Sequence, residues 1–234
     1  MKILVIIPAY NEEACIASTV NKLKKDAPEC DYIVINDCST DNTAAVLEKE
    51  GFNYIHLKSN LGIGGAVSTG YKYALYNDYD IAVQLDGDGQ HDSAYLASVV
   101  KPIVDGEASI VIGSRFIKCE GFLSSAFRRA GITILNGWIR LFSGAKVTDC
   151  TSGYRAVSRE YIRAYAKEYP IDYPEPEAIV LAKLNGATIK EVPVVMKERR
   201  TGKSSIRPIH SLYYMFKVML SIFLCRLTHK KQRG

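Results

Sequence analysis

Two aspartates that directly follow an apolar run are the residues of this sequence whose types and spacing point most clearly to chemistry. The stretch VQLDGDGQH at 83–91 ends on Asp86 and Asp88, each followed by a glycine. A solvated turn would explain one Asp-Gly pair, but it needs no second aspartate. Carboxylate oxygens are ligands that Mg²⁺ or Mn²⁺ takes, and glycines let a bulky anion approach the backbone. The stretch therefore predicts a site for Mg²⁺ or Mn²⁺ together with an anion.

Two further motifs carry groups that could recognise a nucleoside. In PAYNEE, Tyr10 could stack on a base and Glu12 could hydrogen-bond to it, although an acidic residue at a helix N-terminus also matches the helix dipole. In NDCSTDNT, Asp37 is placed to reach a base or a ribose, whereas Asp41 is interpreted as a helix cap. The glycines of NLGIGGAVSTG lack the GxGxxG spacing of a dinucleotide loop, so we do not expect a nicotinamide cofactor.

The elements that must position these motifs alternate along the chain. Apolar runs rich in valine and isoleucine predict strands at 3–7, 32–36, 54–57, 81–85 and 109–113, and the segments between them predict helices at about 12–25, 41–50, 62–77 and 93–105. This alternation predicts an α/β fold with a mostly parallel sheet covered on both faces. Ligands bind at the carboxyl ends of the strands in such sheets, and each polar motif follows one strand.

Length and composition limit the class of protein. The 234 residues are 47% hydrophobic, which suits one α/β domain with a core and excludes a disordered chain. Lysine and arginine outnumber the acidic residues by only 30 to 25, so we expect no nucleic-acid partner. The six cysteines form no CxxC pair, and the apolar run before Pro8 is too short for a signal peptide. These features predict a cytoplasmic protein with reduced thiols.

The C-terminal segment differs from the rest of the chain. Residues 209–227 are nearly all apolar, are interrupted by Lys217 and lead into a basic HKKQRG. A run of about 20 apolar residues could span a bilayer, but Lys217 near its middle would be costly there. We therefore expect a catalytic domain at 1–206 and, at 207–234, an amphipathic helix that lies at a membrane interface. A helix packed on the sheet is the alternative.

Taken in order, the motifs resemble those of one family. IPAYNEE, NDCSTDNT, NLGIGGA, LDGDGQH, GSR, DCTSGYRA and RRTGKSS look like the motifs of family 2 glycosyltransferases, in particular the dolichol-phosphate mannose synthase-like branch that loads sugars onto polyprenyl phosphate. The resemblance covers about residues 3–206. It implies a GT-A fold, a nucleotide-sugar donor and a divalent metal ion held by the DxD motif. The anion expected beside the two aspartates is then the donor diphosphate.

The resemblance also implies roles for individual residues. Asp86, Asp88 and Gln90 match the metal and diphosphate site of the family, and Asp88, Arg115 and Arg199 match its catalytic positions. Arginine suits phosphate because its planar fork binds it in a bidentate manner. The other nucleotide-sugar-binding residues that we expect are Pro8, Tyr10, Glu12, Asp37, Gly64, Lys203, and Arg128 or its neighbour Arg129.

Three functions are compatible with these matches, in order of preference. The first is an inverting transferase that moves a hexose from UDP-glucose, with GDP-mannose as the alternative donor, to polyprenyl phosphate. The second is a family 2 transferase that adds a sugar to a saccharide hydroxyl of a lipid-linked polysaccharide. A hydroxyl acceptor requires a general base, for which Glu177 and Glu175 are candidates and Asp149 is a weaker one. The third is an inactive nucleotide-sugar-binding scaffold, which would have little use for two metal ligands.

The preferred function sets the expected surroundings of the protein. A lipid acceptor requires the enzyme to reach a bilayer, so we expect peripheral attachment to the inner membrane face. A small integral membrane protein could dock on the C-terminal helix, and the sequence is compatible with a homo-oligomer.

Overall fold

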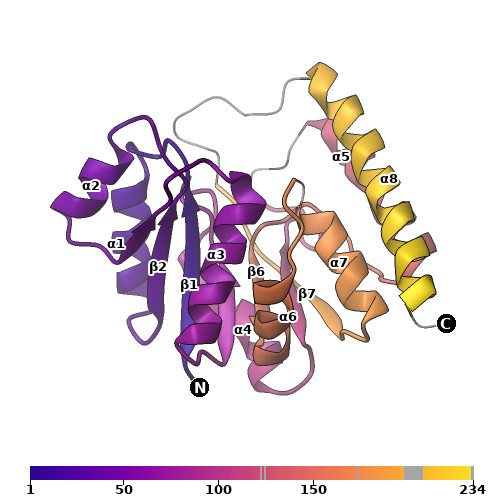
Figure 1. Cartoon of the computed structure of the whole chain (residues 1–234), viewed down its shortest axis with the longest axis horizontal. Helices are drawn as coiled ribbons and strands as arrows, with labels where there is room; N and C mark the ends of the chain where they lie inside the picture. Colours follow the sequence, from indigo (N-terminus) through magenta and orange to yellow (C-terminus); the bar gives the residue numbers. More distant parts are fainter. Residues whose placement is uncertain (122, 124, 173, 198–207, 233–234) are drawn as a thin grey trace.

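The computed structural model describes residues 1–234 except 122, 124, 173, 198–207 and 233–234, and the last helix has described side chains only at 215–228. Within these residues a seven-stranded sheet forms the centre of the fold, with the strand order β3-β2-β1-β4-β6-β5-β7 (Figure 1). The strands are β1 (Ile3–Ala9), β2 (Asp31–Asn36), β3 (Tyr54–His56), β4 (Ile81–Gln84), β5 (Ile110–Ser114), β6 (Arg155–Ser158) and β7 (Ile189–Pro193). The sheet is mostly parallel, because only β6 runs antiparallel to its neighbours.

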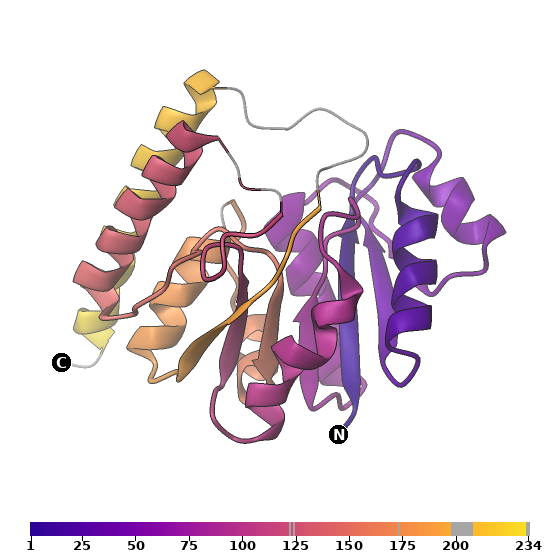
Figure 2. The ribbon, with the colours of Figure 1, turned by 180° about the vertical axis from the view of Figure 1, so that it is seen from behind.

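Helices cover both faces of the sheet, as the continuous apolar strands require. Along β1, Leu4 and Ile6 face one core while Val5 and Ile7 face the other, and all four side chains are fully buried. The first core is covered by α3 (Gly62–Tyr76), α5 (Ala126–Ser143), α6 (Arg159–Lys167), α7 (Pro174–Leu184) and α8 (Pro208–Gln232). The second is covered by α1 (Ile16–Asp26), α2 (Thr43–Lys49) and α4 (Leu96–Val104), which Figure 2 shows from behind.

The expected α/β fold is confirmed, with one shift and one addition. All five predicted strands are present, but α1 begins at Ile16 rather than near Glu12. The reason is a turn in which the carbonyl of Glu12 accepts the N–H groups of Cys15 and Ile16. After residue 114 the chain adds β6, β7 and α5 to α8, of which only the C-terminal helix was predicted.

The C-terminal helix α8 packs on the domain along one side. Val218 and Ile222 belong to the core, and Nε1 of Trp138 on α5 donates to the carbonyl of Met219 at 3.0 Å. Lys217, the charge that interrupts the apolar run, is ion-paired with Asp172. The alternative of a helix packed on the domain is therefore confirmed for this side of α8, whereas contact with a membrane stays a prediction. The boundary expected at 206 lies outside the described residues.

The helices α5 and α8 lie side by side and run in the same direction (Figures 1 and 2). The side chain of Met215 approaches Gly131 near their beginnings, and the rings of Phe142 and Phe223 meet 5.8 Å apart further along. Among the described residues, no helix has the length and hydropathy of a membrane span.

Candidate active site

The loop after β4 holds the two predicted metal ligands by local hydrogen bonds. Oδ1 of Asp86 accepts a hydrogen bond from Nε2 of Gln84 at 3.1 Å, and the Asp86 N–H donates to Nδ1 of His91 at 3.0 Å. Oδ1 of Asp88 accepts the N–H of Gln90 at 3.0 Å. Both aspartates remain partly exposed at the carboxyl end of the strand. The loop thus presents two oriented carboxylates to solvent.

The residues of this loop fit a divalent metal ion of the Mg²⁺ or Mn²⁺ type. Asp86 and Asp88 supply hard oxygen atoms, and such ions are commonly held by one or two carboxylates together with substrate phosphates. Nε2 of Gln90 donates to the Lys197 carbonyl at 3.3 Å, so Oε1 is the side-chain atom left as a ligand. No group of three or more Asp, Glu, His or Cys side chains forms a cage in the described part of the chain. The donor set is therefore that of an open site which a diphosphate would complete.

The predicted nucleoside-binding loops meet the DxD loop at the same edge of the sheet. The Asp37 N–H donates to the carbonyl of Ala9 at 2.9 Å, and the Gly87 N–H donates to the carbonyl of Pro8 at 3.2 Å. The backbones after β1, β2 and β4 are therefore adjacent. Tyr10 is 47% exposed, as a residue that stacks on a base would be. Asp37 is buried, and its Oδ1 accepts the Leu61 N–H at 2.7 Å, so it also fixes the loop before α3.

Residues not singled out from the sequence hold two of these loops together. Oδ1 of Asn11 accepts the Thr40 N–H at 2.8 Å, and a carboxylate oxygen of Glu13 accepts the Asn42 N–H at 2.9 Å. Asp41, interpreted as a cap, accepts the N–H of Thr43 at 2.9 Å and that of Glu13 at 3.1 Å. The charged motifs PAYNEE and NDCSTDNT therefore serve partly to join the β1–α1 and β2–α2 loops to each other.

Gly64 has a packing role that its expected part in donor binding did not include. A Cβ atom at this position would lie 2.3 Å from the carbonyl oxygens of Pro170 and Ile171. Only glycine allows the backbone before α7 to approach α3 so closely. The structure explains Gly64 through this contact between two backbones, so a contact with the donor is not needed to account for it.

Arg115, predicted to engage phosphate, is paired inside the protein. Its Nε and Nη2 atoms donate to the two carboxylate oxygens of Asp149 at 2.7 and 2.6 Å, and both residues are buried. This bidentate pair occupies one edge of the guanidinium, which leaves Nη1 for any phosphate. Asp149 is fully buried, and its N–H is bound by Glu191 at 2.9 Å. The suggestion that Asp149 acts as a general base is therefore wrong, because its carboxylate is enclosed and ion-paired.

The two candidate bases of the YPEPEA segment face different parts of the molecule. Glu177 accepts hydrogen bonds from Oγ of Ser221 at 2.6 Å and from Sγ of Cys225 at 3.3 Å, so it faces α8. Burial raises the pKa of Glu175, the positive charge of Arg155 opposes this, and the negative charge of Asp86 adds to it. Glu175 is thus the member of the pair that lies near the DxD loop. Of the two candidate bases, Glu177 is bound to side chains of α8, and the role of Glu175 stays a prediction.

Arg155 is a buried cation that the sequence did not single out. Its guanidinium donates to the carbonyls of Ser152, Glu175 and Cys150 at 2.8, 2.7 and 2.9 Å. These bonds join β6, the loop before it and the first turn of α7. The signal available in the sequence was the SGYRAV stretch, in which an arginine directly precedes two apolar residues.

The remaining predicted phosphate-binding residues lie at or beyond the described region. Arg128 is exposed in the first turn of α5, where its N–H donates to Oγ of Ser125 at 3.4 Å. Arg199 and Lys203 lie outside the described residues. Their expected roles stay predictions.

Solved structures share this architecture. A crystal structure of glucosyl-3-phosphoglycerate synthase from Mycobacterium tuberculosis, in complex with Mn²⁺, UDP-glucose and phosphoglyceric acid, superposes with a TM-score of 0.73 over 96% of this chain and 79% of the other. The two sequences are 20% identical, a level at which the likeness shows the fold alone. The mostly parallel sheet with helices on both faces is thus a fold of the GT-A type.

The chain belongs to Glycosyl transferase family 2, whose family model matches residues 4–166. Among similar sequences, a UDP-N-acetylglucosamine–dolichyl-phosphate N-acetylglucosaminyltransferase of Methanococcus voltae is 34% identical, with 82% of this chain and 84% of that protein covered. An undecaprenyl-phosphate mannosyltransferase of Micrococcus luteus is 30% identical, with 88% of each covered. A polyprenol monophosphomannose synthase of Mycolicibacterium smegmatis is 29% identical, with 92% and 84% covered. The family resemblance expected from the motifs is confirmed.

Proposed function

We propose that the protein transfers a hexose from a nucleoside diphosphate sugar to polyprenyl phosphate, with inversion at the anomeric carbon. The observation that carries this proposal is the presence, on one folded unit, of the Asp86–Asp88 loop and of an exposed apolar face on α5 and α8. A water-soluble donor needs the first feature, and a lipid acceptor needs the second. The printed names of the three relatives, which refer to undecaprenyl, dolichyl and polyprenol phosphate, support the same acceptor class.

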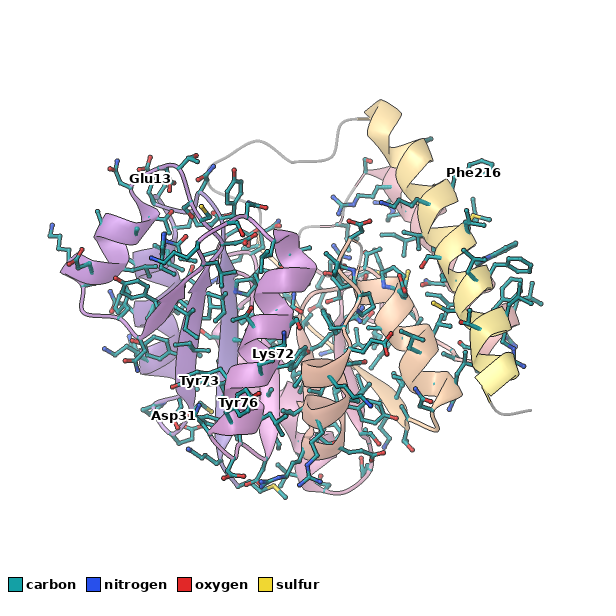
Figure 3. All side chains as sticks on the ribbon, in the orientation of Figure 1. Glu13, Asp31, Lys72, Tyr73, Tyr76 and Phe216 are labelled. Carbon is teal, nitrogen blue, oxygen red and sulfur yellow. The ribbon has the colours of Figure 1, made fainter. Side chains whose placement is uncertain are left out.

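The apolar surface, which we term the α5–α8 face, consists of large side chains that project into solvent. Its members are Phe127, Ile134 and Leu141 on α5 and Phe216, Leu220, Phe223, Leu224 and Leu227 on α8. The three on α5 recur every seven residues, so they lie on one side of that helix. Phe216 is 78% exposed and points away from the domain in Figure 3. Soluble proteins rarely expose such a group, and it fits the interfacial region of a bilayer.

Positive charge on the same two helices supports attachment to anionic lipid. Arg128, Arg129 and Arg140 on α5 and Arg226 on α8 are exposed. The cytoplasmic leaflet carries a negative surface potential that attracts lysine and arginine near the membrane. We therefore place the protein peripherally on the cytoplasmic membrane face, in contact through the α5–α8 face.

The protonation state of the acceptor decides whether a base is required. A phosphate monoester has a second pKa of about 6, so it is largely ionised at neutral pH and can attack without losing a proton. The carboxylate of Glu177 is bound by Ser221 on α8, and that of Asp149 is ion-paired with Arg115. Neither is free to act as a base, which agrees with an acceptor that needs none. A saccharide hydroxyl would need one, and Glu175 near Asp86 is the residue that favours this second candidate function.

Within the proposal, the chain's own residues bind and orient the substrates. The loops that carry Tyr10 and Asp37 bind the nucleoside, because both follow strands beside the DxD loop. Asp86, Asp88 and Gln90 hold a divalent ion, which when bound neutralises charge on the leaving diphosphate. Arg128, Arg199 and Lys203 bind phosphate groups of donor or acceptor, as the family resemblance implies.

The decisive experiment is a donor-by-acceptor assay with purified protein and liposomes. The donors are radiolabelled UDP-glucose, GDP-mannose and UDP-N-acetylglucosamine, with UDP-glucose tested first, and the acceptors are polyprenyl phosphate and a lipid-linked saccharide. We expect sugar on polyprenyl phosphate, as a product of inverted anomeric configuration. Product on the saccharide alone would replace this function by the second candidate. No transfer from any donor would contradict both.

A further inference from the structure

Gln84 is the one polar residue of β4, whose other three residues are apolar. It is the last residue of β4, it is fully buried, and its register partners are Ile6 in β1 and Arg155 in β6. Burying an amide costs free energy unless its polar atoms are hydrogen-bonded. An aliphatic residue would satisfy the sheet equally well, so the side chain needs a separate explanation.

The side chain of Gln84 is directed at a predicted metal ligand. Its Nε2 atom donates to Oδ1 of Asp86 at 3.1 Å. From the other side, Nδ1 of His91 accepts the Asp86 N–H at 3.0 Å, and the His91 ring stacks on Tyr154 with 5.0 Å between centroids. The carboxylate of Asp86 is thus hydrogen-bonded by Gln84 and faced by Nε2 of His91 at 3.7 Å from Oδ2, while its backbone N–H is bound by the same imidazole.

Gly153 closes the space around this hydrogen bond. A Cβ atom at Gly153 would lie 2.9 Å from Nε2 of Gln84 and 2.9 Å from Oδ2 of Asp86. Such distances are too short for an unstrained contact, so even alanine would push the two side chains out of their present positions. The backbone at Gly153 therefore lies close to the side chains of Gln84 and Asp86 and limits their movement.

The buried amide of Gln84 costs folding free energy, because one of its polar atoms has no hydrogen-bond partner. Oε1 of Gln84 is the one buried side-chain nitrogen or oxygen, within the described residues, that has no hydrogen-bond partner. An unsatisfied buried acceptor costs about 1–3 kcal/mol. Reversing the amide would bring its oxygen against the Asp86 carboxylate, so the carboxylate dictates the orientation. Proteins retain such costs chiefly at functional sites.

We propose that Gln84 is a positioning residue that fixes the Asp86 carboxylate for a divalent metal ion. The inference rests on the proposed function, since it concerns the same Asp86–Asp88 site. A neutral amide suits this role because it orients the carboxylate and leaves its negative charge available, whereas lysine or arginine would form an ion pair with it. Partners that orient metal ligands typically contribute about 10- to 100-fold in metal affinity.

The test is Mn²⁺ binding to the full chain, measured by electron paramagnetic resonance with and without excess UDP or GDP. Gln84→Met keeps the length and apolar packing of the side chain but donates no hydrogen bond. Gly153→Ala removes no polar group and displaces the side chains of Gln84 and Asp86 by contact alone. We expect the Kd for Mn²⁺ to rise about 10- to 100-fold in each variant. Transfer activity should return at high Mn²⁺, with kcat close to that of the original protein.

A matched control removes a buried hydrogen bond elsewhere. Tyr161→Phe deletes the hydroxyl that donates to the Ala182 carbonyl at 3.3 Å, and it should leave Mn²⁺ affinity unchanged. Unchanged affinity in both Gln84→Met and Gly153→Ala would overturn the inference and leave the proposed function standing. No Mn²⁺ binding by the original protein, with either nucleotide, would overturn both. If Gln84→Met does not fold, Gly153→Ala decides, because its added methyl group meets only the ends of two side chains.

Discussion

Two regions of the molecule differ in what their side chains contact. They are the loops at the carboxyl ends of β1, β2 and β4, and the α5–α8 face. In the loops, polar side chains bind the backbone of a neighbouring loop, as Asn11 binds Thr40 and Asp37 binds Leu61. On the α5–α8 face, side chains such as Leu141 and Phe216 are 71% and 78% exposed. These hydrogen bonds between loops are formed within the chain itself. The face would lower its free energy only against another apolar surface.

Two pairs of helices differ in the same way, in how many large apolar side chains they expose. Among the described residues, α1 and α2 expose no large apolar side chain, whereas α5 and α8 together expose eight. Helix α8 packs on α5 and α7, and its inward side chains Val218 and Ile222 already join the core, so this packing does not require the apolar exposure. The difference teaches that one side of the molecule is built for water-soluble ligands and the other, in the function we propose, for lipid.

The largest loss of transfer activity is expected from a change in the loop after β4. Asp88→Ala removes one of two carboxylates from an exposed loop, so transfer should fall by about 10³-fold or more while the protein stays folded. EDTA should abolish transfer reversibly. Steady-state assays with radiolabelled donor measure the loss, and thermal unfolding of the variant checks the fold. Full activity in excess EDTA, or in the variant, would remove the metal from the proposal.

A variant at Arg115 tests whether this residue mainly stabilises the fold, through its ion pair with Asp149, or mainly binds phosphate. Arg115→Ala leaves the buried Asp149 carboxylate without its partner, and breaking a buried ion pair in this way costs about 3–5 kcal/mol. Urea unfolding of the variant should show a loss of this size. A variant as stable as the original protein that has nevertheless lost transfer would show that the arginine mainly serves phosphate binding.

The apolar side is tested by polar substitutions on the α5–α8 face. Leu141→Gln and Leu220→Gln should each weaken binding to anionic liposomes about tenfold, because each removes part of the 1.5–3 kcal/mol of a buried leucine, by a rough estimate. Mn²⁺ and nucleotide binding should not change. Tyr76→Gln is the matched control, since Tyr76 is 83% exposed on α3, well away from α8 (Figure 3).

Liposome flotation measures this binding. Equal binding by all three variants and the original protein would mean that another surface, or a small integral membrane protein docked on these helices, provides the attachment. A second copy of the chain on the face would instead appear as a dimer that the leucine variants dissociate, which sedimentation would detect.

The smallest effect on transfer is expected at Glu175. With a phosphate acceptor, Glu175→Gln should keep kcat within about threefold, whereas loss of a general base would cost on the order of 10² to 10⁴. A large loss together with a saccharide product would favour the second candidate function. Glu177→Gln should affect the attachment of α8 more than kcat, because its carboxylate binds Ser221 and Cys225.

Glu175 also gives a pH-dependent effect with a defined sign. Burial raises its pKa above the ordinary 4.5 in the folded state, so the folded protein loses stability as pH rises through the raised value. Glu175→Gln lacks this loss. Its melting temperature should therefore exceed that of the original protein at neutral pH, and the difference should vanish below pH 4.5. A difference that grows toward acid pH would contradict the assignment.

The polar region could be predicted from the sequence because its signals are local. The strands β1, β2 and β4 are rich in valine and isoleucine, and Asp37 and Asp86 lie within two residues of the ends of β2 and β4. The hydrogen bonds that join the loops were not predictable, since Asn11 and Thr40 come from different motifs. Gln84 looked like part of an apolar strand, and only its neighbours in space reveal its contact with Asp86.

The second half was harder because its contacts depend on packing over long sequence distances. Arg115 and Asp149 are separated by 34 residues, so the ion pair that encloses Asp149 and occupies one edge of Arg115 could not be predicted. Glu175 and Glu177 looked equivalent in YPEPEA. They lie two residues apart in a helix of about 3.6 residues per turn, so they face nearly opposite directions. Pro174 at the first helical position was the available signal.

The seam between α5 and α8 provides an intrinsic optical reporter. Trp138 is the only tryptophan of the 234 residues, and its indole is bound to the Met219 carbonyl and packed 4.8 Å from the ring of Phe142. Its fluorescence therefore reports one event, the docking of α8 on α5, without interference from the donor site. Emission spectra recorded on adding vesicles would reveal whether the helix stays docked or detaches as the protein reaches lipid, with no label attached.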